Sequence, residues 1–350
     1  MDVHNELTMM LVGDNFFVDY KDMDTIYENV MPTLRKADLI FANLEMPISN
    51  RGQPVVDKPL IEAVYRMPVS AIGTLKKTGV NAVSLATNHM MDFGSDALMQ
   101  TIELLDKARI KHAGAGKNID EARKPAMVKK DGCQVAFLSL STLYLPSFSA
   151  TKNRPGMTTF KVHTAYQPPP RVFEQPGSPP IVLTFPEPGD VELLKEDIRK
   201  ARGQADIVVI AWHWGTSESL RKIVDYQKEL GHISIDAGAD LVIGHHPHIL
   251  QGIEVYRGKI IAYSLGNFAT YIPTKKFWPF FGKESIILKC RILNKKISQI
   301  SFIPILINER WQPELVEGKK AKPVVDMMEQ LCSELGTTLR AHGNEVEVVI

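Results

Sequence analysis

The sequence of 350 residues has few cysteines. There are three, Cys133, Cys290 and Cys332, and they lie far apart in the chain. No pair has the short spacing of a zinc knuckle, and an odd, scattered set does not indicate a disulfide framework. Each cysteine lies in or near an apolar stretch, so we expect buried free thiols.

An excess of charge of one sign is also missing, because 41 basic side chains nearly balance 40 acidic ones. This balance argues against nucleic acid or an anionic membrane surface as a partner, and leaves open a local pocket for an anionic substrate. No apolar run approaches the roughly 20 residues that span a bilayer, and residues 1–6 lack a signal-peptide pattern. If Met1 is the native start, we expect a cytoplasmic protein without a membrane span. The oligomeric state is not predicted.

The chain does contain a repeated pattern, in which a short apolar run ends in polar residues and a helical stretch usually follows. Apolar runs of this length are typical of strands buried on both faces. They occupy residues 9–12, 39–42, 82–86, 207–211, 241–243 and 260–263. Helical periodicity covers residues 22–36, 95–108, 191–202 and 219–237. This alternation predicts an α/β protein.

Two stretches interrupt the alternation. Residues 145–189 hold ten of the 22 prolines. Prolines at that density prevent helix formation, so we expect a long irregular excursion, either a linker between lobes or, as we favour, a loop that crosses near the site. Residues 270–282 carry aromatic side chains, including Trp278, that predict a lid or pocket wall, with plain packing as the alternative.

The domain hypothesis follows from these boundaries. We predict one domain over residues 1–310, with the irregular Pro-rich insertion at about 145–189. A last strand and a helix near residues 323–335 predict a C-terminal helical extension over residues 311–350, packed on the same domain.

Residues able to bind metal follow five of the predicted strands. They are Asp14, Glu45, Asn88, His213, His246 and His248. Because strand ends are rigid and the loops that leave them can aim side chains into one crevice, we expect these residues to converge. His246 and His248 are two residues apart, so an extended backbone would send both imidazoles to one side. A carboxylate in such a set can bridge two ions, as two-metal catalysis requires.

Each of these residues also has a structural explanation when taken alone. Asp14 and Glu45 could cap helices or pair with buried arginines. Asn88 could cap a helix or shape a turn. His213, between two tryptophans, could be a hydrogen-bonded core histidine. As a set at five strand ends, however, the residues favour a metal site.

In these residues and the motifs that contain them, the chain resembles the CapA (poly-γ-glutamate capsule biosynthesis) branch of the calcineurin-like metallophosphoesterase superfamily. The segments that carry the resemblance follow the family's order from about Thr8 to Phe302. They are LVGD at 11–14, ANLE at 42–45, LATNHMMDFG at 85–94, WHWG at 212–215, GADLVIGHHPHILQ at 238–251 and YSLGNF at 263–268. The resemblance implies a four-layer α/β/β/α sandwich with a two-metal site at one edge of the paired sheets.

The resemblance also implies two divalent ions, Mn, Fe or Zn. Its motifs assign the first metal to Asp14 and His248, the second to Asn88, His213 and His246, and the bridge to Glu45. Related phosphoesterases begin with Asp-x-His, whereas here Phe16 stands two residues after Asp14, so the first metal lacks a ligand and is expected to bind more weakly. The His-Pro-His pattern makes His246 a ligand, with His245 as the fallback and as a substrate-binding candidate.

His89 matches the superfamily's catalytic histidine, which stays off the metals and protonates the leaving group. Asp92, three residues on, could orient it, and the alternative is a structural histidine bonded to Asp92. Further substrate-binding candidates are Asn267, Trp278 and Glu218. Glu218 follows Ser217, which stands where the branch commonly has an acidic residue.

The chemistry implied by this site is metal-dependent hydrolysis. A water that bridges two divalent ions is acidified and becomes a hydroxide nucleophile. We therefore expect a hydrolase that cleaves a phosphoester, or an amide or ester, of a small or anionic metabolite. Two alternatives remain open: a protein of poly-γ-glutamate (capsule) biosynthesis or export, and a non-catalytic binding protein on a degenerate hydrolase fold.

Overall fold

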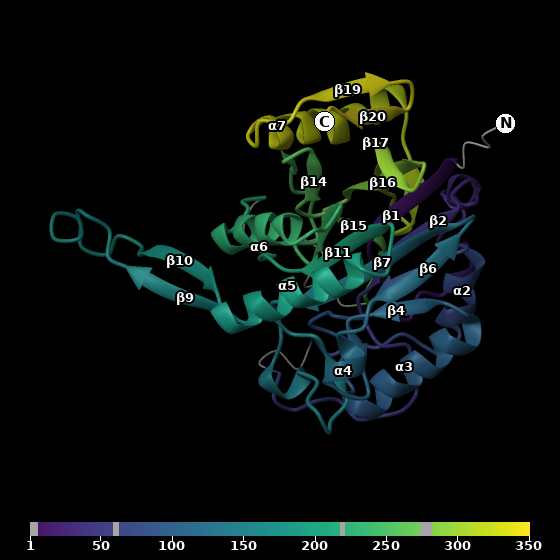
Figure 1. The fold of residues 1–350 in the computed structure, drawn as a ribbon, viewed down its shortest axis with the longest axis horizontal. Helices are drawn as coiled ribbons and strands as arrows, with labels where there is room; N and C mark the ends of the chain where they lie inside the picture. The colour runs from purple at the N-terminus through teal and green to yellow at the C-terminus, as the bar shows by residue number, and fades with distance from the viewer. Residues whose placement is uncertain (1–5, 59–62, 218–220, 274–281) are drawn as a thin grey trace.

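The computed structural model describes residues 6–58, 63–217, 221–273 and 282–350. Two large β-sheets pack face to face, and helices cover their outer faces (Figure 1). Within these described ranges, no helix combines the length and the apolar character needed to cross a bilayer.

The first sheet has ten strands, in the order β19-β20-β17-β16-β1-β2-β3-β4, with β15 beside β1 and β18 beside β17. Its strands are β1 (Glu6–Phe17), β2 (Leu39–Leu44), β3 (Ala82–Ser84), β4 (Lys111–Ala113), β15 (Asn267–Tyr271), β16 (Glu284–Leu293), β17 (Lys296–Ile307), β18 (Pro313–Leu315), β19 (Leu339–His342) and β20 (Glu345–Val348). Strands β1 to β4 run parallel to one another, so their carboxyl ends lie at one edge, whereas β16 is antiparallel to β1.

The second sheet has six strands, in the order β13-β14-β12-β11-β7-β6. They are β6 (Ala126–Lys130), β7 (Cys133–Ser141), β11 (Ile207–His213), β12 (Leu241–His245), β13 (Ile253–Tyr256) and β14 (Lys259–Ala262). Strands β7, β11, β12 and β14 run parallel, which again gathers their carboxyl ends at one edge.

The helices form the two outer layers. The first sheet is covered by α1 (Met31–Leu34), α2 (Ala71–Lys77) and α3 (Gly94–Ala108), and the second by α5 (Pro188–Arg202) and α6 (Asp225–Asp236). Shorter or peripheral elements are η1 (Met23–Thr25), α4 (Ile119–Ala122), β5 (Ala115–Gly116), η3 (Pro146–Phe148), β8 (Gly156–Met157), η5 (Gly318–Lys320) and α7 (Lys322–Ser333).

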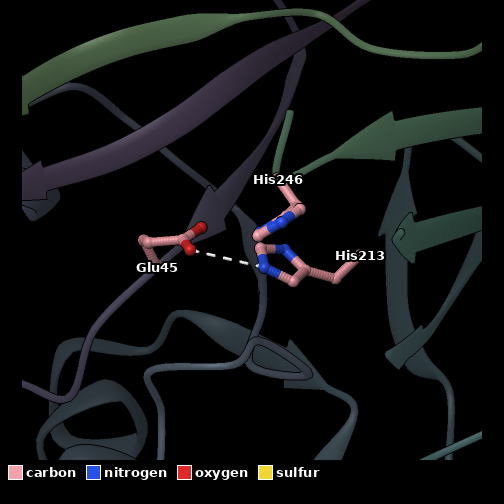
Figure 2. Close-up of side chains that lie close together, drawn as sticks. All are labelled: Glu45, His213 and His246. Carbon is pink, nitrogen blue, oxygen red and sulfur yellow. Dashed lines mark ion pairs between the residues drawn. The ribbon is translucent and has the colours of Figure 1, made fainter. Parts of the chain in front are cut away.

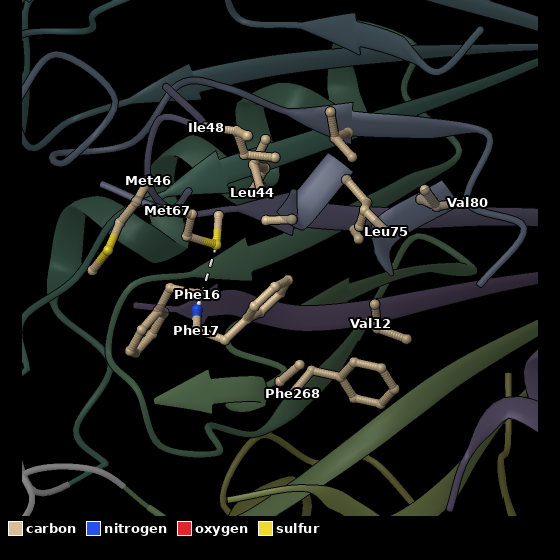
Figure 3. Close-up of a cluster of buried hydrophobic side chains, with 14 of the residues drawn as sticks. Val12, Phe16, Phe17, Leu44, Met46, Ile48, Met67, Leu75, Val80 and Phe268 are labelled. Carbon is tan, nitrogen blue, oxygen red and sulfur yellow. Dashed lines mark hydrogen bonds between the residues drawn. The ribbon is translucent and has the colours of Figure 1, made fainter. Parts of the chain in front are cut away.

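Alternate residues of the central strands face different layers, as strand geometry requires. In β1, Leu11 packs between the two sheets whereas Val12 packs under the helices of the first sheet. Between the sheets, the rings of Phe41 and Phe137 stack with centroids 4.6 Å apart. Figure 3 shows the outer core of the first sheet, where Phe16 lies beside Phe17 near the end of β1. Helix, sheet, sheet and helix thus form the predicted α/β/β/α sandwich.

The Pro-rich stretch differs from its prediction. Residues 162–186, which we call the arm, form a two-stranded hairpin of β9 (Val162–Gln167) and β10 (Ile181–Pro186) instead of an irregular loop. The arm projects away from the body of the molecule and does not cross the sheets (Figure 1). Most of its prolines lie in the connection between the two strands, where no ladder donor is needed, so a high proline density and a hairpin are compatible.

Two helical expectations also change. Residues 22–36 contain η1 and the single short helix α1, with Pro32 in its first turn, instead of one continuous helix. The C-terminal extension contains α7 but is not purely helical. Its hairpin β19–β20 joins the first sheet, where β20 pairs with β17.

Candidate metal centre

The predicted ligands come together at the shared edge of the two sheets. Asp14 lies in β1, at a bulge where the pairing with β2 shifts register. Its position depends on Gly13, because a Cβ there would lie 2.0 Å from the carbonyl oxygen of Gly266. The Asp14 amide donates to that same carbonyl at 3.0 Å. The bulge therefore fixes the Asp14 carboxylate against the turn that precedes β15.

Asp14 is fully buried and faces two imidazoles. Its Oδ1 lies 3.3 Å from Nδ1 of His245, and its Oδ2 lies 3.2 Å from Nδ1 of His248. Burial opposes ionisation, but the contacts with His245 and His248 outweigh it and hold the pKa of Asp14 well below its usual range. An ionised carboxylate is thus held at this position.

A second group lies beside the first. Figure 2 shows Glu45, His213 and His246 pointing toward one another. One ligand atom from each lies within 4.8 Å of the others, and His213 Nε2 is 3.4 Å from Glu45 Oε1. Asn88 joins them through its Oδ1, which lies 2.9 Å from His213 Nε2. Four of the predicted ligands thus meet in this half of the site.

The electrostatics of this group suit a cation. Burial raises the pKa of Glu45 to about 7, and the negative charge of Asp14 adds to this shift. Burial lowers the pKa of His213 to about 3, and burial with the neighbouring His213 lowers the pKa of His246 well below its usual value. Both imidazoles are therefore neutral at physiological pH, the form in which histidine binds metal.

Several buried polar atoms in the centre have no hydrogen-bond partner among the described residues. They are Oε1 of Glu45, Nδ1 of His213, Nδ1 of His246, Oδ1 of Asn43 and both ring nitrogens of His245. Unsatisfied buried polar atoms are costly, and proteins normally avoid them. A donor set of neutral imidazoles, carboxylates and amide oxygens is one that divalent metals accept, so these residues fit a metal centre.

Asn43 is a central residue that the sequence analysis did not single out. Its Nδ2 donates to Asp14 Oδ1 at 2.9 Å and to Glu45 Oε2 at 2.7 Å. It therefore links the carboxylates of the two groups. Asn43 lies inside the ANLE motif at 42–45, and this position was the only signal in the sequence that could have pointed to it.

The two histidines of His-Pro-His reach the centre in a different way from the one predicted. Their backbones are not extended: φ is +95° at His246 and +57° at His248. These angles lie in the left-handed region, which is unfavourable for residues with a Cβ and concentrates at functional sites. As a result the rings diverge, His246 towards Glu45 and His248 towards Asp14, with centroids 5.8 Å apart.

His89 and Asp92 form the predicted pair, with Nδ1 2.7 Å from Oδ2. The structure adds a third member, Lys58, which the sequence analysis missed. Its Nζ lies 2.6 Å from Asp92 Oδ1 and 2.9 Å from His89 Nδ1. Burial lowers the pKa of Lys58, and burial together with the Lys58 charge lowers the pKa of His89. No motif or spacing marks Lys58, because its loop reaches the site only through tertiary packing.

The remaining candidates have different positions. Asn267 lies against His248, where its Oδ1 is 3.0 Å from Nδ1 and its Nδ2 donates to the backbone oxygen at 3.1 Å. Phe16 is buried and meets the His248 ring edge-on, with centroids 5.5 Å apart. Glu218 and Trp278 lie outside the described residues.

Comparison with known proteins identifies the family. The family model for the bacterial capsule synthesis protein PGA_cap matches residues 3–271. The capsule biosynthesis protein CapA of Bacillus anthracis is 30% identical over 320 residues, which are 87% of this chain and 69% of that protein. The PGA biosynthesis protein CapA of Bacillus subtilis (strain 168) is 31% identical over 271 residues, 75% of this chain and 63% of that protein.

A solved structure supports the fold. The crystal structure of a novel phosphatase from Mycoplasma pneumoniae superposes with a TM-score of 0.50 at 13% sequence identity, covering 87% of this chain and 95% of the phosphatase. At this level of identity the match shows the architecture alone. The resemblance to the CapA family inferred from the motifs is confirmed, and the chain belongs to the bacterial capsule synthesis protein PGA_cap family.

Proposed function

We propose that this protein is a dinuclear metal-dependent hydrolase. The observation that carries the proposal is the group of buried imidazole nitrogens that, with one carboxylate oxygen and one amide oxygen, have no hydrogen-bond partner among the described residues. Such a group is unfavourable without a cation and is the normal first coordination sphere of a divalent metal.

The residues divide between two metal positions. Asp14 and His248 would hold the first ion, and Asn88, His213 and His246 the second, with Glu45 between them. Mn²⁺, Fe and Zn²⁺ all suit this mixture of oxygen and nitrogen ligands. Bound there, a pair of divalent ions would supply an acidified water and neutralise charge on the scissile group.

The residues of the chain itself complete the site. His89 is the proposed proton donor to the leaving group. Its Nδ1 is engaged by Asp92 and Lys58, so Nε2 is the atom that would carry the transferred proton. Asp92 is itself fixed by the backbone amide of Tyr65, whose nitrogen lies 2.9 Å from Oδ2. These contacts hold the His89 ring in one orientation.

The proposed substrate is a phosphoester, or an amide or ester, of a small or anionic molecule. The phosphatase with a similar fold favours the phosphoester. A role in the biosynthesis or export of a capsule polymer is the second candidate function. It is favoured by the family model and by the names of the relatives in both Bacillus species.

Metal analysis of the purified protein tests the proposal, followed by a screen of phosphoesters, amides and thioesters with added Mn²⁺. We expect near-stoichiometric metal and Mn²⁺-dependent hydrolysis, and both should fall in His246→Ala. His163→Ala, which removes a histidine of the arm, is the matched control and should keep both. A protein that binds no metal and hydrolyses nothing would instead support a non-catalytic binding role.

A further inference from the structure

His245 is a buried histidine of the centre whose contact with the Asp14 carboxylate is long, 3.3 Å between Nδ1 and Oδ1. It is 1% exposed, and neither ring nitrogen has a hydrogen-bond partner among the described residues. A buried core histidine normally donates one ring N–H and accepts at the other nitrogen. The contact of Nδ1 with the Asp14 carboxylate, at 3.3 Å, leaves both ring nitrogens without a hydrogen bond, and an ion shared with Asp14 would account for this placement.

We propose that His245 is a ligand of the first metal, together with Asp14 and His248. This inference rests on the proposed dinuclear function and replaces the substrate-binding role predicted for His245. His245 would give the first metal a second imidazole. It would replace the histidine of the Asp-x-His pattern, whose position is occupied here by Phe16.

Among the described residues, the His–carboxylate contacts between proposed ligands are longer than the hydrogen-bonded pairs, while the ion pair of His112 with Asp106, away from the centre, is longer still at 3.7 Å. Hydrogen-bonded pairs are short: 2.7 Å for His89–Asp92 and 2.9 Å for His232–Glu254. The pairs in the centre are longer, 3.3 Å for His245–Asp14. The Glu45–His213 pair has a similar separation of 3.4 Å.

This longer separation is the one expected of two ligands on one ion. Two atoms that each lie about 2.1 Å from a metal are about 3.0–3.4 Å apart when the angle between them is about 90–109°. The spacing of His245 from Asp14 thus matches ligands that share a cation better than a direct hydrogen bond.

The sheet register explains why His245 points inward. His213 ends β11 and His245 ends the neighbouring parallel strand β12, and the two residues are directly paired. Paired residues of neighbouring strands place their side chains on the same face of a sheet. His213 extends to Glu45 and His245 to Asp14. Two adjacent strands therefore each deliver one imidazole, one to each half of the centre.

The close packing around Gly244 holds this arrangement. A Cβ at Gly244 would lie 2.0 Å from the carbonyl oxygen of Tyr263, so the end of β12 is pressed against the chain that follows β14. The backbone before His245 therefore has little freedom to withdraw the imidazole from the centre.

Metal titration of the full chain distinguishes the roles. Protein stripped with a chelator is titrated with Mn²⁺, and the equivalents and dissociation constants are measured together with the electron paramagnetic resonance spectrum. We expect two equivalents and a spin-coupled signal in the parent protein. His245→Ala should keep one equivalent with unchanged affinity, weaken the other by more than about 10-fold and give the six-line spectrum of an isolated ion.

Controls separate the possible outcomes. His246→Ala should weaken the other equivalent, and His163→Ala should leave both unchanged. If His245→Ala does not fold, as judged by circular dichroism, His245→Gln keeps the side-chain volume and a polar group. Two equivalents with unchanged affinities in a folded His245 variant would overturn this inference and leave the dinuclear function standing. A parent protein that binds no Mn²⁺ would overturn both.

Discussion

Two histidine–carboxylate pairs, one beside the candidate metal centre and one at the base of the arm, have the same distance between nitrogen and oxygen. His89 lies 2.7 Å from Asp92, and His163 lies 2.7 Å from Glu187. Their surroundings are opposite. The side chains of the first pair are 12% and 0% exposed, whereas those of the second are 36% and 34% exposed.

A lysine accompanies each pair. Lys58 Nζ lies 2.6 Å from the Asp92 carboxylate and is 12% exposed, while Lys161 Nζ lies 3.9 Å from Glu187 and is 56% exposed. Charge pairs in water are screened and contribute little, whereas the same contacts in a buried site are strong and fix orientation. Residue types and one distance therefore do not separate His89 from His163. Burial and a tightly held third partner do.

The largest expected effect comes from removing His89, with removal of His163 as the matched control. His89→Ala should lower kcat by about 10²–10⁴-fold, the usual contribution of a general acid, and leave the metal content unchanged. The loss should be smaller for p-nitrophenyl substrates, whose leaving group needs no proton. His163→Ala should change neither quantity. Steady-state kinetics and metal analysis of both variants make the measurement.

Either of two results would break this comparison. A His89→Ala protein that loses metal would make His89 a ligand, and one with unchanged kcat would make it a structural histidine bonded to Asp92.

The same contrast shows what the sequence could and could not predict. The α/β class and the strand ends follow from local patterns, because apolar runs and the polar residues after them lie within a few positions of each other. His213 and Glu45 could therefore be placed at strand ends from the sequence. Asp14 was expected just after a strand but lies inside β1, because the strand continues through the bulge to Phe17. The four-layer α/β/β/α arrangement was predicted only from the resemblance to the family.

What the sequence could not predict depends on tertiary contacts. Lys58 belongs to a loop with no distinctive spacing and meets Asp92 only after folding. The hairpin of the arm could not be predicted because the prolines of residues 168–180 indicate irregular backbone. The two flanking strands become recognisable only through their pairing with each other. The turn at His246 requires a left-handed backbone angle that residue type alone does not indicate.

A smaller effect is expected from the lysines. Lys58→Met should lower kcat by about 10–100-fold with little change in KM, because Lys58 contacts His89 and Asp92 and acts by positioning the His89 ring. Lys58→Arg should recover part of the activity. Lys161→Met is the exposed control and should be neutral. The separate kcat and KM values decide the role, since a raised KM with unchanged kcat would show that Lys58 binds substrate instead.

The smallest effect is expected from removing the outer arm. Deletion of residues 166–182, with Ala165 joined to Leu183 through Asn-Gly, preserves a register pair and supplies a two-residue turn. Phe173 is 96% exposed and Tyr166 68%, so their removal sacrifices little buried surface. We expect unchanged metal content and a melting temperature within about 2 °C of the parent. If kcat or KM changed instead, the arm would contribute to substrate binding or turnover. The exposed pair at its base could then no longer serve as a non-functional counterpart of the buried pair.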